Sequence, residues 1–271
     1  MTQPAVTFQI RQLEEQFNTR LFDRTHNKVT LTDVGKQVYS YADRILKLYE
    51  EMTHNITEMT GDVSGAVTLG ASTTVAEYML PLLIGEFKNK FPDVVINLRE
   101  SNSEDIVNMV ENNDIDLGIV EGSVNNKNLV VEECKTDHLV VIMPNGHALA
   151  SEKKLGVQDF IAYPFISREH GSGTQESITS YVEKYGNGES LNICFELSSP
   201  EAIKGAVEAG MGLSIVSRST IIKEIKLGTL TAIELSPSLE RPFSFVRQRY
   251  KFKSRAADQL LAFSQEFCKD D

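Results

Sequence analysis

Apolar residues near the start of the chain recur at helical spacing. Val6, Ile10, Leu13 and Phe17 lie four, three and four residues apart and form one apolar stripe. Pro4 precedes the stripe, and proline is tolerated where a helix begins because its missing N–H would have no partner there. The pattern predicts a helix that begins at about Pro4.

A short extended segment and a long helix are predicted next. Residues 21–22 supply an apolar anchor, residues 24–28 a basic turn and residues 29–31 an extended return, which together predict a small β wing. Thr32 and Asp33 suit the cap of a second helix, which continues without proline past residue 59.

The second helix carries a narrow apolar seam whose spacings alternate between three and four. The seam consists of Val38, Tyr41, Ile45, Leu48 and Met52. Charged residues flank it, which favours a short coiled coil between two chains, with packing on its own domain as the alternative. Glycine and serine then interrupt the pattern and indicate a hinge at about residues 60–65.

From residue 66 the chain alternates short β-rich runs with helical periods. This order occupies residues 66–144 and repeats over about residues 145–242, which predicts parallel βαβ units in two α/β lobes. The expected strands are 66–70, 94–100, 117–122, 129–134, 138–144, 164–169, 193–198, 213–217, 230–235 and 242–248. The first of these is followed by a helix through Phe87. The last strand and the terminal helix are expected to return to the first lobe, so that two crossings form a cleft.

Composition restricts the function classes. A chain of 271 residues can bury two or three cores. Its formal charge of -11 argues against a protein that coats nucleic acid. The acidic excess lies in residues 61–271, whereas residues 1–60 are nearly balanced, so a specific DNA reader stays possible. The sequence shows no membrane span and no leader pattern, and we expect a cytoplasmic protein.

Reactive side chains do not gather in the sequence. The three cysteines, Cys134, Cys194 and Cys268, are odd in number and widely spaced, so they predict buried apolar fillers rather than a disulfide framework or a zinc site. The five histidines are dispersed, and no nucleophile has a base in a recognisable order. We therefore expect no catalytic residues, no metal and no cofactor.

The opening segment TQPAVTFQIRQLEEQFNTRLFDRTHNKVTLTDVGKQV resembles the recognition helix, wing and linker helix of LysR-type transcriptional regulators. LGASTTVAEYMLPLLIGEFKNKFPDV, NNDIDLGIVEG and EAGMGLSIVS resemble the effector-binding domain of that family. The resemblance implies an α/β protein that joins a partial winged helix-turn-helix, a long linker helix and a two-lobed effector domain like a type 2 periplasmic binding protein. The implied ranges are 1–31, 32–60 and 61–271, with lobe 1 at about 66–144 and 243–271 and lobe 2 at about 145–242.

The family's first helix and turn are not found before Met1, which predicts truncation within the helix-turn-helix. A late start codon is the preferred reason, ahead of a cut chain or a short form that binds DNA poorly. By the same resemblance, the residues that face the DNA major groove are Gln3, Pro4, Thr7, Phe8 and Arg11. Those implied to lie near the sugar-phosphate backbone are Arg24 and Thr25. Glutamine and arginine suit base edges, and hydroxyls suit phosphates or bases.

Effector contacts are expected at the carboxyl ends of strands, where helix N-termini offer unpaired N–H groups. The candidates are Ser72, Thr74, Asn102, Glu121, Arg168 and Thr174. Helix capping is the alternative role for the hydroxyls at residues 72–74, and capping by Ser103 is the alternative to a ligand contact at Asn102. Glu121 would lie at the cleft rim, where it either favours a polar or cationic group or pairs with Arg168.

Residues 168–174 form a loop with two glycines between a strand and a helix. The glycines allow backbone amides close to a ligand, and Arg168 adds a cation suited to carboxylate, phosphate or sulfur oxyanions. The loop resembles that of the family branch that regulates carbon fixation and sulfur assimilation, which implies an anionic metabolite. A plain flexible loop is the alternative.

These observations predict a regulator that reads promoter DNA in response to a small anionic metabolite. The resemblance also implies self-association as a dimer or tetramer and contact with RNA polymerase. The chief alternative is a cytoplasmic small-molecule-binding protein whose residues 1–60 serve only for oligomerisation. An enzyme on a similar two-lobed fold is a remote third possibility, since the cleft lacks a nucleophile.

Overall fold

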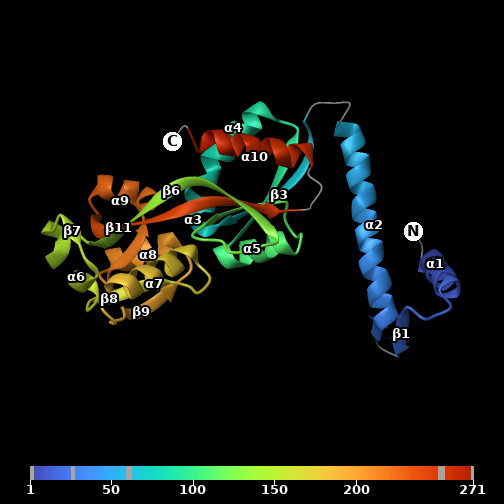
Figure 1. The fold of residues 1–271 in the computed structure, drawn as a ribbon, viewed down its shortest axis with the longest axis horizontal. Coiled ribbons are helices and arrows are strands. Elements are labelled where there is room, and N and C mark those ends of the chain that lie inside the picture. Colours follow the sequence, from blue (N-terminus) through green and yellow to red (C-terminus); the bar gives the residue numbers. More distant parts are fainter. Residues whose placement is uncertain (1–2, 26–27, 59–62, 250–253, 270–271) are drawn as a thin grey trace. The chain divides into compact units, whose positions relative to one another are not determined.

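The computed structural model describes residues 3–25, 28–58, 63–249 and 254–269 (Figure 1). The chain divides into two compact units, residues 1–60 and 61–271. The first unit contains α1 (Gln3–Gln16), β1 (Phe22–Thr25), β2 (Lys28–Leu31) and α2 (Asp33–Glu58). The predicted first helix and wing are confirmed, and so is the second helix as far as Glu58; its predicted continuation past residue 59 lies outside the described residues.

The wing is an antiparallel hairpin of β1 and β2 that packs against the start of α2. Leu21 is buried, and a Cβ on Gly35 would lie 2.1 Å from the Leu21 carbonyl oxygen, so only glycine permits this approach. The Thr32 hydroxyl accepts a hydrogen bond from the Gly35 N–H at 2.9 Å. Thr32 therefore caps α2, as its sequence position predicts.

The second unit contains the remaining elements. Its helices are α3 (Thr73–Tyr78), α4 (Leu80–Lys90), α5 (Ser103–Glu111), η1 (Ala148–Ser151), α6 (Val157–Phe160), α7 (Gly173–Tyr185), α8 (Pro200–Glu208), η2 (Arg218–Ile221), α9 (Ile222–Leu227) and α10 (Arg255–Phe267). Its strands are β3 (Gly65–Ser72), β4 (Val94–Ser101), β5 (Leu117–Glu121), β6 (Leu129–Pro144), β7 (Lys154–Leu155), β8 (Pro164–Arg168), β9 (Asn192–Leu197), β10 (Ser214–Ser217) and β11 (Leu230–Gln248).

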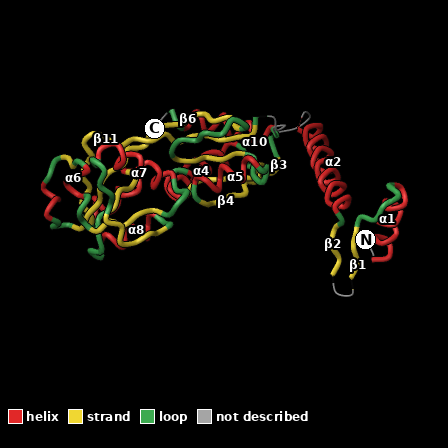
Figure 2. The backbone as a smooth tube through the Cα atoms, turned by 60° about the horizontal axis from the view of Figure 1, so that its bottom comes forward, coloured by secondary structure: helices red, strands yellow, loops and turns green. Residues whose placement is uncertain are grey.

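Two long strands, β6 and β11, connect the lobes of this unit (Figures 1 and 2). They pair antiparallel along most of their length within a sheet of order β10-β6-β11-β5-β3-β4. The parallel pairing predicted for the first lobe is present, because β3 pairs parallel with β4 and β5. The prediction that each long strand is two separate strands was wrong, since the β6–β11 ladder runs on across the polar stretch between the apolar runs. The ladder has two register shifts, between Glu234 and Leu239 and between Phe243 and Ser244.

Two groups of apolar residues form the cores of the lobes. In the first lobe, β3, α4 and α10 bury a cluster that includes Leu69, Phe87 and Leu260. In the second lobe, β6 contributes Leu139 and Val141 to a cluster with β8 and α7, and Val140 and Ile142 to a cluster with α8. The predicted lobe boundary at residue 144 therefore falls too late, because the second half of β6 already packs in the second lobe. The terminal helix returns to the first lobe as predicted, where α10 contacts α4 (Figure 1).

The helix predicted to run through Phe87 is interrupted. The structure has α3 and then α4, with Met79 between them and Pro81 in the first turn of α4. Proline lacks the N–H that a continuous helix would use at this position, which accounts for the interruption.

The cysteine prediction is corrected by the structure. Cys134 and Cys268 form a disulfide between β6 and the end of α10, and Cys194 is free and exposed rather than buried. Their wide spacing in sequence concealed a pairing that only the return of α10 to the first lobe creates.

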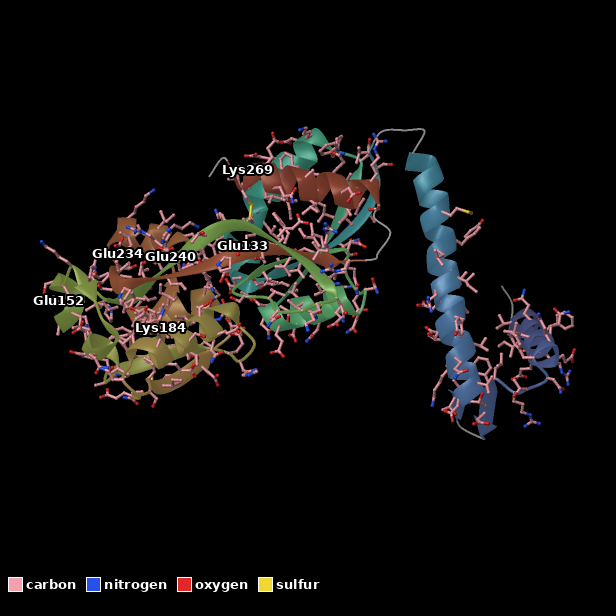
Figure 3. All side chains as sticks on the ribbon, in the orientation of Figure 1. Glu133, Glu152, Lys184, Glu234, Glu240 and Lys269 are labelled. Carbon is pink, nitrogen blue, oxygen red and sulfur yellow. A yellow bond between two sulfur atoms is a disulfide. The ribbon has the colours of Figure 1, made fainter. Side chains whose placement is uncertain are left out.

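Acidic side chains lie along the exposed sides of the two long strands. Figure 3 labels Glu133 on β6 and Glu234 and Glu240 on β11, and all three are exposed. They belong to the unit that carries most of the negative charge of the chain. Among the described residues, no helix is both long and apolar enough to cross a membrane.

Candidate functional site

A small cavity, with a volume of about 10 Å³, lies where the two lobes meet. It is lined by Thr74, Arg168, Thr174, Pro200, Ile203, Val216, Ser217 and Thr220. These residues come from the ends of β8 and β10, from the first turns of α3, α7 and α8, and from η2. Hydroxyls and one guanidinium thus face a cavity that helix N-termini surround, which is an arrangement suited to an anion.

Arg168 is the cation of this cavity. The residue is 3% exposed. Its Nε donates to Glu169 Oε2 at 2.8 Å and its Nη2 to Glu169 Oε1 at 3.0 Å. This fork uses two of the five N–H donors of the guanidinium and fixes its plane. The guanidinium has no other hydrogen-bond partner among the described residues, and Arg168 is one of the residues that line the cavity.

Two serines at helix starts have buried hydroxyls without a partner among the described residues. They are Ser72, before α3, and Ser172, before α7, and neither makes a side-chain cap hydrogen bond. A buried polar group without a partner costs about 1–3 kcal/mol. The capping alternative for Ser72 is therefore not realised. Each serine is two residues before a threonine that lines the cavity.

Asn102 and Glu121 do not line the cavity. Asn102 caps α5, since its Oδ1 accepts from the Asp105 N–H at 2.8 Å. The Ser103 hydroxyl instead donates to the Glu121 carbonyl oxygen at 3.0 Å. The Glu121 carboxylate is buried and pairs with Arg241 rather than with Arg168, with Nη2 and Oε2 2.8 Å apart.

A buried charge network links the cavity wall to the crossing strands. Besides Glu121, Arg241 binds Asp137 (Nε to Oδ2, 2.9 Å) and donates from Nη1 to Thr174 Oγ1 at 2.7 Å. Thr174 donates to Glu121 Oε1 at 3.2 Å, and Ser217 donates to Asp137 Oδ1 at 2.6 Å. Arg241 and Asp137 are partners in the β11–β6 register. Two of the cavity hydroxyls are therefore held by groups on the strands that join the lobes.

Sequence reasoning missed this network. Asp137 directly precedes the predicted strand 138–144, and Arg241 directly precedes the predicted strand 242–248. These positions are the one feature of the sequence that could have pointed to the two residues. A charged residue beside such a run is exposed more often than buried. Only the pairing of β6 with β11 shows that these two charges oppose each other.

A second polar cluster bridges the lobes beside the cavity. Tyr78 on α3 donates its hydroxyl to Glu201 on α8, and Lys204 Nζ lies 2.8 Å from Glu201 and 2.7 Å from Glu224. Lys204 Nζ also donates to the Thr220 carbonyl oxygen at 2.9 Å. Burial would lower the pKa of Lys204, but hydrogen bonds to Glu201 and Glu224 outweigh burial and raise that pKa above its ordinary value. The amine stays charged and ties α8 to α9.

A pH-dependent effect is expected at Glu77, which also lies at this junction. Burial, together with the charges of Glu100 and Glu201, raises the pKa of the Glu77 carboxyl. Because the pKa of Glu77 is higher in the folded state, this residue contributes to stability at pH values below the ordinary pKa of a glutamate. That contribution is lost as the pH rises through the raised pKa. Glu77→Gln is therefore expected to raise the melting temperature by about 1–3 °C near pH 8 and to change nothing near pH 4. Thermal scans over this range, with exposed Glu183→Gln as control, measure the difference; an equal gain at both ends would contradict it.

A steric prediction concerns Gly173, the first residue of α7. A Cβ there would lie 2.0 Å from the Glu121 carbonyl oxygen, so this glycine allows the close approach of β5 rather than of a ligand. Gly173→Ala is expected to lower the free energy of unfolding by about 2–4 kcal/mol. A Cβ on exposed Gly85 in α4 would have nothing within 4 Å. Gly85→Ala is therefore expected to raise the free energy of unfolding by about 0.5–1 kcal/mol. Urea unfolding compares the pair, and equal stabilities would refute the steric argument.

The predicted DNA contacts belong to the first unit. Three of them have described side chains, all exposed on α1: Thr7, Phe8 and Arg11. The others have backbones on α1 or β1, but their side chains lie outside the described residues: Gln3, Pro4, Arg24 and Thr25. The apolar stripe of α1 remains partly exposed within this unit, with Val6 at 40% and Phe17 at 49%.

Comparisons with known proteins match both units. A family model described as the LysR substrate binding domain matches residues 60–269, and one described as a bacterial regulatory helix-turn-helix protein of the lysR family matches residues 1–36. A probable RuBisCO transcriptional regulator from Cyanidioschyzon merolae (strain NIES-3377 / 10D) is 32% identical over 95% of this chain and 86% of its own length. The HTH-type transcriptional regulator CysL of Bacillus subtilis (strain 168) is 31% identical over 91% of this chain and 82% of its own.

Solved structures agree with the fold. The Synechocystis PCC6803 CcmR regulatory domain, in complex with 2-PG, has a TM-score of 0.71 and 29% identity, covering 76% of this chain and 99% of that one. HinK, a LysR family transcriptional regulator from Pseudomonas aeruginosa, has a TM-score of 0.68 over 99% of this chain and 89% of its own, at 21% identity. The likeness to HinK extends through both units.

Proposed function

The chain belongs to the LysR family of bacterial transcriptional regulators, and we propose that a small anionic metabolite, bound in the cavity between its lobes, controls how it reads promoter DNA. The observation that carries this proposal is buried Arg168, held in a fork by Glu169 with N–H donors left at the cavity. A buried cation without a full set of partners is costly, and an oxyanion satisfies it.

The side chains that line the cavity also favour an oxyanion, because several of them bear hydroxyls. Thr74 lines the cavity and can donate its hydroxyl to an oxyanion. The hydroxyls of Thr174, Ser217 and Thr220 already donate to protein acceptors, so they line the cavity as polar neighbours. Ser72, two residues before Thr74, adds a buried hydroxyl that has no partner in the described part of the chain. CcmR, whose regulatory domain was solved with 2-PG, supports the same class of ligand. We assign the effector to small molecules that carry a carboxylate or a phosphate.

The charge network suggests how binding acts on the lobes. Thr174 and Ser217 line the cavity and hold Arg241 and Asp137 on the crossing strands. An effector that contacts these hydroxyls binds one arrangement of the lobes more tightly and shifts the population toward it. The shift then changes how copies of the chain associate.

The DNA side of the proposal rests on the first unit. In this proposal the residues of the first unit that contact DNA are Gln3, Pro4, Thr7, Phe8, Arg11, Arg24 and Thr25. Phe8 is 61% exposed on α1. Along α2, Tyr41, Ile45, Leu48 and Met52 are all exposed, and an apolar seam of this kind is covered when two copies associate. We infer a dimer or tetramer that works in the cytoplasm as a regulator rather than an enzyme, and that contacts RNA polymerase at the promoter.

Two titrations of the full chain test the proposal. Calorimetry with 2-PG, inorganic phosphate and glycerol is expected to show saturable binding of an anion and none of glycerol. Fluorescence anisotropy with the intergenic DNA upstream of its own gene, against scrambled DNA, is expected to show specific binding that the bound anion alters. Anion binding without specific DNA binding would support the small-molecule-binding alternative. Specific DNA binding with no response to any anion would overturn the effector assignment.

A further inference from the structure

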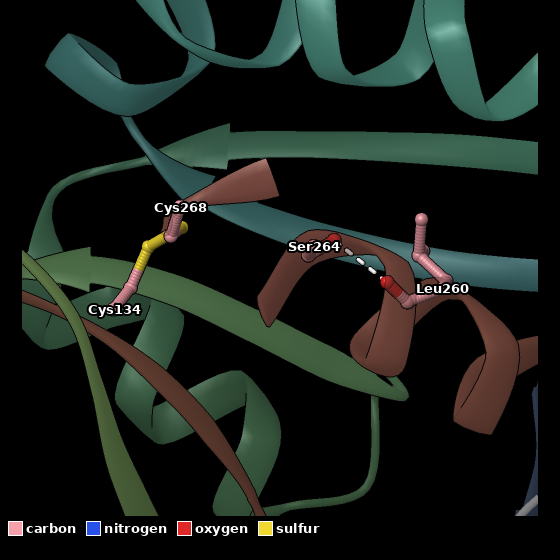
Figure 4. The surroundings of a disulfide bond; sticks show 4 residues. All are labelled: Cys134, Leu260, Ser264 and Cys268. Atoms are coloured by element: carbon pink, nitrogen blue, oxygen red, sulfur yellow. Dashed lines mark hydrogen bonds between the residues drawn. A yellow bond between two sulfur atoms is a disulfide. The ribbon is translucent and has the colours of Figure 1, made fainter. Parts of the chain in front are cut away.

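The disulfide between Cys134 and Cys268 joins parts of the first lobe that are far apart in sequence (Figure 4). Cys134 lies within β6, and Cys268 follows the last residue of α10. The two are 134 residues apart, and their Cα atoms are 5.7 Å apart. This Cα separation is ordinary for a disulfide, so the fold itself brings the two backbones to bridging distance.

The disulfide fastens the end of a helix that other contacts also hold. The ring centroids of Phe263 on α10 and Phe87 on α4 are 5.5 Å apart in the first-lobe core. Gln265 Nε2 donates to Glu132 Oε2 on β6 at 2.5 Å, about one helical turn before the bridge. With the bridge open, packing and this hydrogen bond still retain α10. The expected effect of opening is a looser helix end, not loss of the fold.

The redox state of the compartment in which the protein works determines whether this disulfide is permanent or transient. A LysR regulator works where DNA is kept, and glutathione and thioredoxin-class dithiols keep thiols reduced there. Disulfides in such compartments are usually transient and redox-sensing rather than permanent. We propose that Cys134 and Cys268 form a reversible thiol–disulfide site that exchanges with a dithiol reductant. This step rests on the family assignment and not on the nature of the effector.

The exposures of the two cysteines set the order of the exchange. Cys134 is half-buried, whereas Cys268 is 7% exposed. A thiolate of the dithiol attacks the Cys134 sulfur, and Cys268 leaves as a thiolate that takes up a proton. The second thiol of the reductant then attacks the mixed disulfide and releases the Cys134 thiolate, which is protonated in turn. Two electrons pass to the protein, and the reductant becomes a disulfide; the oxidised form of the same class reverses the reaction.

The redox state of the pair acts on the cavity through α10. This helix contacts β3, which ends at Ser72, two residues before cavity-lining Thr74. Opening the bridge therefore loosens a helix that supports one wall of the cavity. The redox state of the pair becomes a second input to the effector-binding unit.

The test follows the thiols of the full chain. A Cys194→Ser chain, which lacks the exposed free cysteine but keeps the pair, is equilibrated in glutathione buffers of increasing oxidised fraction, quenched with acid, alkylated and weighed by intact mass spectrometry. We expect two alkylated thiols at the reducing end, none at the oxidising end, and a melting temperature about 5–10 °C higher in the bridged form. Adding Cys134→Ser or Cys268→Ser is expected to abolish the redox-dependent shift in melting temperature.

Two results would overturn the proposal. Thiols that remain reduced in every buffer would show that the cysteines only fill the core. A bridge in the folded chain that stays closed at the reducing end of the glutathione series would show a permanent cross-link. Neither result depends on effector or DNA binding, so the redox proposal and the proposed function fail separately.

Discussion

Arg168→Gln is expected to weaken binding of 2-PG by about 10- to 100-fold, because one or two charge-assisted hydrogen bonds to the anion are lost. Arg168 is the one cation that lines the cavity described here. Glutamine keeps polar atoms at the site but cannot reproduce the planar fork that faces Glu169. The dissociation constant from calorimetric titration measures the effect.

Two further variants make this result specific. Arg168→Lys keeps the charge without the fork, and its affinity is expected to fall between those of the native chain and Arg168→Gln. Arg218→Gln removes an exposed arginine paired with Glu234 and is expected to leave binding unchanged. If Arg168→Gln folds and binds 2-PG as the native chain does, the anion does not sit at this guanidinium.

Arg241→Met is expected to lower the free energy of unfolding by about 3–5 kcal/mol, the range for breaking a buried ion pair by removing one partner. The side chains of Arg241 and Glu121 are each 1% exposed, and that of Asp137 is 6% exposed. The substitution leaves two buried carboxylates without their cation. Methionine is similar in length and apolar, so the loss reports the charge and not a large cavity.

Urea unfolding followed by circular dichroism gives this number. The matched control is Arg218→Met, which breaks an exposed ion pair with Glu234 whose side chains are 63% and 49% exposed. An exposed pair contributes about 0–1 kcal/mol, so the control is expected to unfold close to the native chain. Equal losses for the two variants would mean that the buried network does not stabilise the folded state.

The two arginines separate roles that the sequence alone does not distinguish. Arg168 lies near the end of a predicted strand and Arg241 lies directly before one, and both are buried. Arg168 pairs with the half-buried carboxylate of its own neighbour Glu169 and keeps donors for the cavity. Arg241 is enclosed by Glu121, Asp137 and Thr174 and has a structural part. Only the identity of the partners separates Arg168, the proposed effector contact, from Arg241, which supports the strands that join the lobes.

Helices and short strands were predictable from the sequence because their signals are local. The stripe on α1, the seam on α2 and the apolar runs of β3 and β5 repeat at the period of their own backbone, and the side chains of one element produce that repeat. The family motifs lie in the same local segments. For this reason the family, the fold class and the position of Arg168 at a strand end were available before any tertiary contact was known.

The contacts that define the site depend on residues brought together over long sequence distances. Arg241 meets Glu121 and Asp137, and Cys134 meets Cys268, across separations of about one hundred residues or more. No periodicity encodes such a pair, because each partner reads as an ordinary polar or small residue in its own segment. The sequence by itself determined most of the elements, the family and the place of Arg168 at a strand end. The tertiary structure alone decided that β6 and β11 are continuous, that Glu121 pairs with Arg241 and that two cysteines form a disulfide, since burial and pairing depend on neighbours that only packing supplies.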